Sequence, residues 1–125
     1  MLFWVAGFDI LYALADEPFD RRHGLHSVVV RLGRTSSLRL SAVSHFLMLP
    51  CLVAFQALNP ILGWAFQVAI VAIGVLLVYE HSLVTPKGDL QRLNQAFFSV
   101  NVVISLALLA ATMFDIFWAP MLRIW

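Results

Sequence analysis

Three long apolar stretches dominate the chain, at residues 40–58, 61–79 and 97–117. A helix crosses the hydrocarbon core of a bilayer with about 20 mostly apolar residues, so each stretch predicts a transmembrane helix. The apolar stretch within residues 1–15 is shorter and carries Asp9. We expect it to be the end of a spanning helix whose beginning is absent from the chain.

The composition points to the same class of protein. Hydrophobic residues make up 62% of the chain and charged residues 12%, whereas soluble domains have roughly 45–50% and 25%. Because an open sheet cannot satisfy its backbone hydrogen bonds in lipid, the strand-like runs are best interpreted as helices. The sequence therefore predicts an all-α fold, an integral membrane helix bundle.

The basic residues gather in two of the segments that join the apolar stretches. One group lies in residues 16–39 and a smaller one follows residue 79; together they are Arg21, Arg22, Arg31, Arg34, Arg39, Lys87 and Arg92. Only Arg123 lies elsewhere. Because Lys and Arg are enriched in cytoplasmic loops, we expect both basic loops, residues 16–39 and 80–95, to be cytoplasmic and the C-terminus to be external. The predicted location is therefore the bacterial inner membrane, as a multi-pass integral protein.

Four polar residues are spaced at helical intervals where the first apolar stretch meets this basic loop. Asp9, Tyr12, Asp16 and Asp20 are separated by three, four and four residues, so on a continuous helix they share one face. A solvated helix end would explain Asp16 and Asp20 alone. Asp9 lies roughly 10 Å deeper, where an ionisable residue is costly and usually functional.

Cationic residues follow the acidic face directly, at Arg21 and Arg22. Mg²⁺ prefers oxygen ligands and is commonly held by one or two carboxylates plus substrate phosphates, and arginine binds phosphate oxygens in a bidentate manner. Carboxylates and arginines that lie together at one membrane face therefore favour a Mg²⁺–diphosphate site. We expect Pro18 to interrupt the helix and to let the carboxylates of Asp16 and Asp20 converge.

Residues 9–27 follow the pattern Asp-x-x-Tyr-Ala-x-x-Asp-x-x-x-Asp, then basic residues, a glycine and a serine. This pattern resembles the second aspartate-rich motif of the UbiA superfamily of intramembrane prenyltransferases. A second match consists of Glu80-His81-Ser82-Leu83-Val84, Asp89-Leu90 and Asn94-x-Ala96-Phe97-Phe98. It is similar to the 4-hydroxybenzoate polyprenyltransferase-like branch, including members that serve the futalosine route to menaquinone.

The resemblance implies a nine-helix bundle, of which residues 1–125 would be a partial domain from the end of helix six to helix nine. The implied reaction transfers a polyprenyl group from an allylic polyprenyl diphosphate to an aromatic acid such as 4-hydroxybenzoate, in ubiquinone or menaquinone biosynthesis. The family's first motif, Asn-x-x-x-Asp-x-x-x-Asp, is absent from this sequence. The isolated chain is therefore expected to be inactive.

The resemblance also implies roles for individual residues. Asp16 and Asp20 would be the metal ligands that bind Mg²⁺, which bridges to the diphosphate, and Asp9 and Tyr12 would be the catalytic residues that line the deeper cavity. The substrate-binding residues would be Arg21, Arg22, His26, Ser27, Glu80 and His81. Two alternatives stay open: His26 and Ser27 as ordinary polar loop residues, and Glu80 and His81 as an interfacial cap.

Polar residues elsewhere in the spans have simpler interpretations. His45 and Gln56 are expected to form interhelical hydrogen bonds, and Asp115 is expected at the external membrane interface. A small non-enzymatic membrane scaffold or accessory subunit is the alternative function. The sequence leaves open the aromatic acceptor, the prenyl chain length, the oligomeric state and whether Met1 is the natural start.

Overall fold

The computed structural model describes residues 2–83 and 90–118, with side chains described for 2–82 and 98–118. All the regular structure in these ranges is helical, as predicted. The elements are α1 (Leu2–Arg22), α2 (Val28–Leu32), α3 (Arg34–Leu58), α4 (Trp64–Leu83), α5 (Leu90–Met113) and a single π-helical turn (Phe114–Trp118).

Three helices are long and apolar enough to cross a membrane, over Arg34–Leu58, Trp64–Ser82 and Phe98–Trp118. They confirm the three spans expected from the apolar stretches. At most 28% of the apolar window of any of them is buried, so most of their apolar surface faces outward, where lipid or further apolar helices can cover it. The chain is a multi-pass membrane protein.

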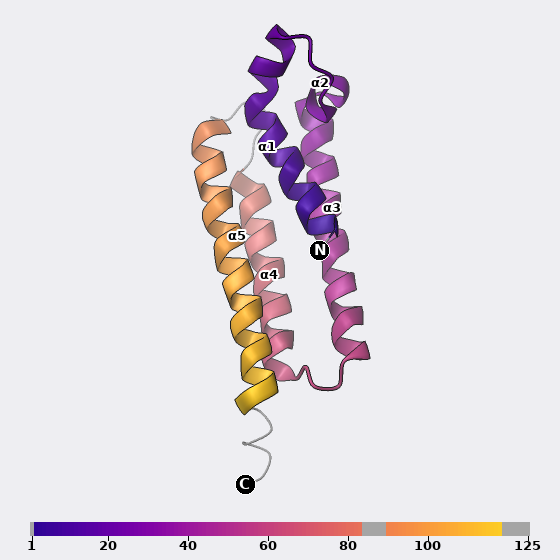
Figure 1. Ribbon diagram of the computed structural model, residues 1–125, viewed down its shortest axis with the longest axis vertical. Coiled ribbons are helices and arrows are strands. Elements are labelled where there is room, and N and C mark those ends of the chain that lie inside the picture. The colour runs from indigo at the N-terminus through magenta and orange to yellow at the C-terminus, as the bar shows by residue number, and fades with distance from the viewer. Residues whose placement is uncertain (1, 84–89, 119–125) are drawn as a thin grey trace.

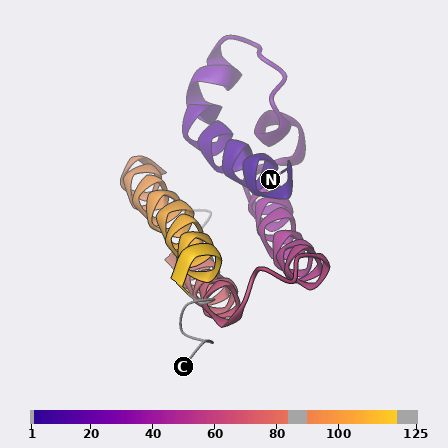
Figure 2. The ribbon, with the colours of Figure 1, turned by 60° about the horizontal axis from the view of Figure 1, so that its bottom comes forward.

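The helices form two pairs that meet along α3 and α4 (Figure 1). α1 lies beside the upper half of α3 as drawn in Figure 1, and α4 and α5 form an antiparallel hairpin (Figures 1 and 2). Buried apolar side chains form two clusters: Leu11, Leu14 and Val29 near the upper end, and Met48, Ile73, Leu77 and Ile104 between α3, α4 and α5. These clusters hold α1 and the α4–α5 hairpin against α3.

The structure corrects two expectations for residues 16–39. Most of this segment is helical, because α1 continues to Arg22 and α3 begins at Arg34 rather than at residue 40. In addition, Pro18 lies inside α1 and does not interrupt it. Glu17, which proline would bias away from helical geometry, is buried and is ion-paired with Arg21 and Arg34. The ion pair with Arg21 within α1 and the tertiary ion pair with Arg34 override the local preference.

Small residues contribute to the contact between α1 and α3. Ser37, Ser41 and Ser44 are buried on the face of α3 that meets α1, and Ser41 Oγ donates a hydrogen bond to the Gly7 carbonyl at 2.8 Å. A Cβ atom at Gly7 would lie 2.3 Å from His45 Cδ2. Gly7 is therefore the position that lets the His45 ring sit between the two helices.

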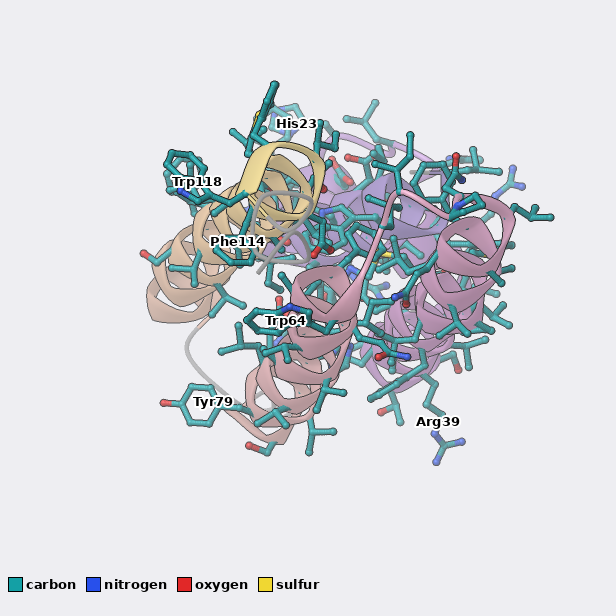
Figure 3. All side chains as sticks on the ribbon, turned by 90° about the horizontal axis from the view of Figure 1, so that it is seen from below. His23, Arg39, Trp64, Tyr79, Phe114 and Trp118 are labelled. Carbon is teal, nitrogen blue, oxygen red and sulfur yellow. The ribbon has the colours of Figure 1, made fainter. Side chains whose placement is uncertain are left out.

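At the opposite end of the bundle, Asp115 caps the amino end of α4. It is 1% exposed, and its carboxylate accepts hydrogen bonds from the backbone N–H groups of Gly63 (2.8 Å), Ala65 (3.3 Å) and Phe66 (2.8 Å). The Trp64 and Phe114 rings pack beside it, with centroids 5.4 Å apart (Figure 3). The N–H groups of the first helical turn, which have no partner within the helix, draw the carboxylate inward. The expected location of Asp115 at the external membrane interface stays a prediction.

Candidate functional site

The predicted acidic face lies on one uninterrupted helix, α1. Asp9 and Asp16 are exposed, while Tyr12 and Asp20 are half-buried. Within the described part of the chain, none of the three aspartates forms an ion pair. Their carboxylates are therefore open to a ligand that brings positive charge.

An open, mainly apolar cleft of about 460 Å³ lies between α1 and α5 beside Asp9. Trp4 and Phe8 line it from α1, and Phe98 and Asn101 line it from α5. A second concavity, of about 570 Å³, lies over α4 from Trp64 to Ala72 and contains no ionisable residue. The cleft beside Asp9 thus combines apolar walls with a carboxylate.

The arginines after the acidic face contact α1 itself. Arg21 Nε donates to Glu17 Oε1 at 2.8 Å, and Arg22 Nε donates to the Pro18 carbonyl at 3.1 Å. Burial alone would raise the pKa of the Glu17 carboxyl, but hydrogen bonds and charge from Arg34 and Arg21 outweigh burial and lower that pKa. Sequence reasoning missed Glu17, whose partner Arg34 lies 17 residues away.

His26 and Ser27 make local contacts in the segment between α1 and α2. His26 Nδ1 lies 3.0 Å from the Gly24 carbonyl. Ser27 is the N-cap of α2, where its Oγ accepts a hydrogen bond from the Val30 N–H at 3.4 Å. These contacts favour the simpler of the two interpretations, in which both residues shape the loop, and their contact with substrate stays a prediction.

Glu80 is too deeply buried to act as an interfacial cap of α4, whereas for partly exposed His81 that alternative stays a prediction. Glu80 is 1% exposed, and together with His81 it faces His45 of α3. Potential metal-ligating atoms of these three residues lie within 4.8 Å of one another, and the group includes none of the aspartates of α1. The hydrogen bond expected for His45 is absent from the described residues, although its ring lies close to the Trp4 backbone. By contrast, Gln56 Nε2 donates to the Gly63 carbonyl at 2.8 Å.

Part of the second sequence match falls beyond the described residues. Asp89, Lys87 and Arg123 lie outside them, and so do the side chains of Arg92 and Asn94. Arg39, in the described part, is exposed and points away from the bundle (Figure 3).

Comparison with known proteins bears directly on the motif in α1. A sequence model of the UbiA prenyltransferase family matches residues 1–103, which include the aspartate face and Glu80–His81. The chain belongs to the UbiA prenyltransferase family. UbiA prenyltransferases generally use a divalent metal ion, and the exposed aspartates of α1 provide the oxygen ligands that a hard divalent ion prefers.

Three curated relatives that the chain matches are named 4-hydroxybenzoate octaprenyltransferase or 4-hydroxybenzoate solanesyltransferase. A 4-hydroxybenzoate solanesyltransferase from Synechocystis sp. is 34% identical over 114 residues, covering 87% of this chain and 37% of the relative. A 4-hydroxybenzoate octaprenyltransferase from Chromohalobacter salexigens is 30% identical over 81 residues, covering 65% and 26%. One from Salmonella paratyphi B is 26% identical over 102 residues, covering 82% and 34%. The chain therefore spans only about a quarter to two fifths of the relatives that it matches, and no solved structure matches it.

Proposed function

We propose that the chain is the C-terminal part of an integral membrane polyprenyltransferase. It would transfer a polyprenyl group from an allylic diphosphate to an aromatic acid such as 4-hydroxybenzoate, in the synthesis of a quinone. The observation that carries this proposal is the open carboxylate face of α1 beside an apolar cleft. The family match and the names of the relatives support the same chemistry.

Asp16 and Asp20 would hold the divalent ion, which we take to be Mg²⁺. Both offer carboxylate oxygens without an ion-pair partner among the described residues, and the exposure of Asp16 leaves room for the water ligands that Mg²⁺ retains. When bound, Mg²⁺ would neutralise the charge that develops on the leaving diphosphate. Arg22, which is exposed, could leave the Pro18 carbonyl and bind the diphosphate at modest cost.

The cleft beside Asp9 would receive the reacting groups. In the reaction the allylic carbon–oxygen bond breaks, diphosphate leaves, an aromatic carbon attacks the allylic cation, and the ring then loses a proton. The faces of Trp4 and Phe8 at the cleft would stabilise the cation, and the apolar walls would limit access of water. Asp9 and Tyr12 would position the acceptor.

We infer that the end of α1 that carries Asp20 faces the cytoplasm. Arg21, Arg22 and Arg31 are exposed at this end, and clustered arginines near the ends of spans are typical of the cytoplasmic side. Cysteine labelling from either side of the membrane tests this topology, with Arg31→Cys or Asn59→Cys as the single cysteine after Cys51→Ser removes the exposed native one. Labelling of the Arg31 position from the outside would refute it.

Activity of the isolated chain is not expected, because the family's first aspartate motif is absent from the sequence. The test supplies the upstream half of a UbiA protein in the same membrane, together with Mg²⁺, a polyprenyl diphosphate and 4-hydroxybenzoate. Prenylated product is then measured. Turnover by the isolated chain would overturn the expectation that both halves are needed.

The metal site is tested by Asp16→Asn and Asp20→Asn in that reconstituted enzyme. Each should lower the rate by at least about 100-fold, the size of effect seen when one group that stabilises transition-state charge is removed. Glu17→Gln is the matched control, since it removes the same charge from the same helix at a residue already bound by arginines. Full activity of either aspartate variant would refute the assignment.

A further inference from the structure

A second group of possible metal ligands lies away from the aspartate face, between α3 and α4. His45 projects from α3, and Glu80 and His81 project from the last turns of α4. His45 and Glu80 are each 1% exposed, and His81 is partly exposed. Their potential ligand atoms lie within 4.8 Å of one another, and the His45 and His81 rings meet edge to face at 5.3 Å between centroids.

This group contains nearly all the unsatisfied polar atoms of the described interior. Six buried side-chain polar atoms in that part of the chain lack a hydrogen-bond partner, and all but Ser37 Oγ belong to these three residues. They are both ring nitrogens of His45, both carboxylate oxygens of Glu80, and His81 Nε2. A buried carboxylate without a partner is strongly unfavourable, so the arrangement calls for a bound cation or a shared proton.

The donor set favours a particular class of cation. Two imidazoles and one carboxylate are the protein ligands of many zinc sites, which keep a fourth position for water or another group. Imidazole also suits the other late first-row divalent metals, whereas Mg²⁺ selects oxygen ligands. The His81 Nδ1 atom lies 3.0 Å from the Leu77 carbonyl, which orients the ring and leaves Nε2 for a metal, as is typical of metal-binding histidines.

The surroundings provide space and access. With metal–ligand distances near 2.1 Å, ligand atoms in a tetrahedral zinc site are roughly 3.4 Å apart, so the side chains need to close in by about an ångström. Gly7 supplies the room for His45, because any Cβ at this position would overlap the ring. The partial exposure of His81 gives an ion a route of entry.

We propose that His45, Glu80 and His81 bind a divalent transition-metal ion of the zinc class, in a site separate from the aspartates of α1. The ion would link α3 to α4 and leave one coordination position for water. This inference does not depend on prenyl transfer, because it concerns residues outside the proposed Mg²⁺–diphosphate site. Its test therefore uses metal binding as the readout.

The experiment titrates Zn²⁺ and Co²⁺ into the 125-residue chain in nanodiscs, purified without a polyhistidine tag. The wild type should bind one Zn²⁺ ion with micromolar or tighter affinity, and Co²⁺ should give the visible absorption of a four-coordinate site. His45→Gln, Glu80→Gln and His81→Gln should each weaken binding by more than about 100-fold, since even outer-shell partners contribute 10–100-fold. His23→Gln and His26→Gln, at the exposed histidines of the chain, are the matched controls and should bind as the wild type does.

Several outcomes would overturn the proposal. One is a wild-type chain that binds neither ion. This result does not depend on whether any variant folds. Another is Zn²⁺ binding that is lost in Asp16→Asn and retained in Glu80→Gln, which would place the ion on α1. A third concerns the melting temperature. If neither Zn²⁺ nor a chelator changes it in the wild type, while the wild type still melts at a higher temperature than Glu80→Gln, the three residues share a proton instead of a metal.

Discussion

Replacing Asp115 with alanine removes the carboxylate that caps α4 from 49 to 52 residues further along the chain. Three backbone N–H groups lose their acceptor, at Gly63, Ala65 and Phe66. Losing an N-cap acceptor costs about 0.5–2 kcal/mol, and a buried donor left without a partner costs about 1–3 kcal/mol. Because only Phe66 is fully buried among the three, we expect the free energy of unfolding to fall by about 2–4 kcal/mol.

The measurement is unfolding by SDS in mixed micelles, followed by far-ultraviolet circular dichroism. Asp115→Asn keeps an oxygen acceptor but loses the charge that favours a helix amino end, so its loss should be nearer 1 kcal/mol. Asp9→Ala is the control, since this exposed aspartate forms no ion pair within the described residues and should change the free energy by less than about 0.5 kcal/mol. An Asp115→Ala variant as stable as Asp9→Ala would refute the reasoning.

Three further predictions concern the packing of α1. Gly7→Ala should destabilise the chain by about 1–3 kcal/mol in thermal unfolding followed by circular dichroism, because the new methyl group overlaps His45. Gly74→Ala is its control: the nearest atom is 3.7 Å away, so this variant should be neutral or stabilising. Ser41→Ala should cost about 1 kcal/mol through its lost 2.8 Å hydrogen bond, and an unchanged melting temperature would contradict this. The pKa of Glu17 is lowered in the folded state, so this residue should contribute stability above about pH 4.5 that is lost as the pH falls further. Glu17→Gln should remove this pH dependence. If the melting temperatures of the two proteins change in parallel with pH, the ion pairs do not stabilise the fold.

The helical class and the three spans could be predicted from the sequence because hydropathy acts over whole segments. Lipid leaves few other structures for about 20 apolar residues, so the α3, α4 and α5 spans follow from composition. Their ends could not be predicted as well. α3 starts at Arg34, before its apolar stretch, because its first turns pack on α1 and α2 through Ser37 and Leu38.

The candidate site was predictable only as far as it is local in sequence. Spacing along one helix was enough to place Asp9, Asp16 and Asp20 on α1. Contacts between helices leave no such pattern in the sequence. Glu17 pairs with Arg34, which lies 17 residues away, and His45 of α3 lies close to Glu80 of the neighbouring helix α4. The rule that an ionisable residue within an apolar span is usually functional applies to His45 as well as to Asp9, but we expected only an interhelical hydrogen bond from His45.

The cap on α4 also has a consequence for the order of assembly during synthesis. Gly63 and its acceptor Asp115 are 52 residues apart, and at about 5–20 residues per second the ribosome takes roughly 3–10 s to connect them. Throughout that interval the first turn of α4 must find other acceptors, in water or lipid head groups. The hairpin of α4 and α5 is therefore completed late, when the turn that carries Asp115 has been synthesised. A chain halted before Asp115 would leave the translocon with the amino end of α4 uncapped.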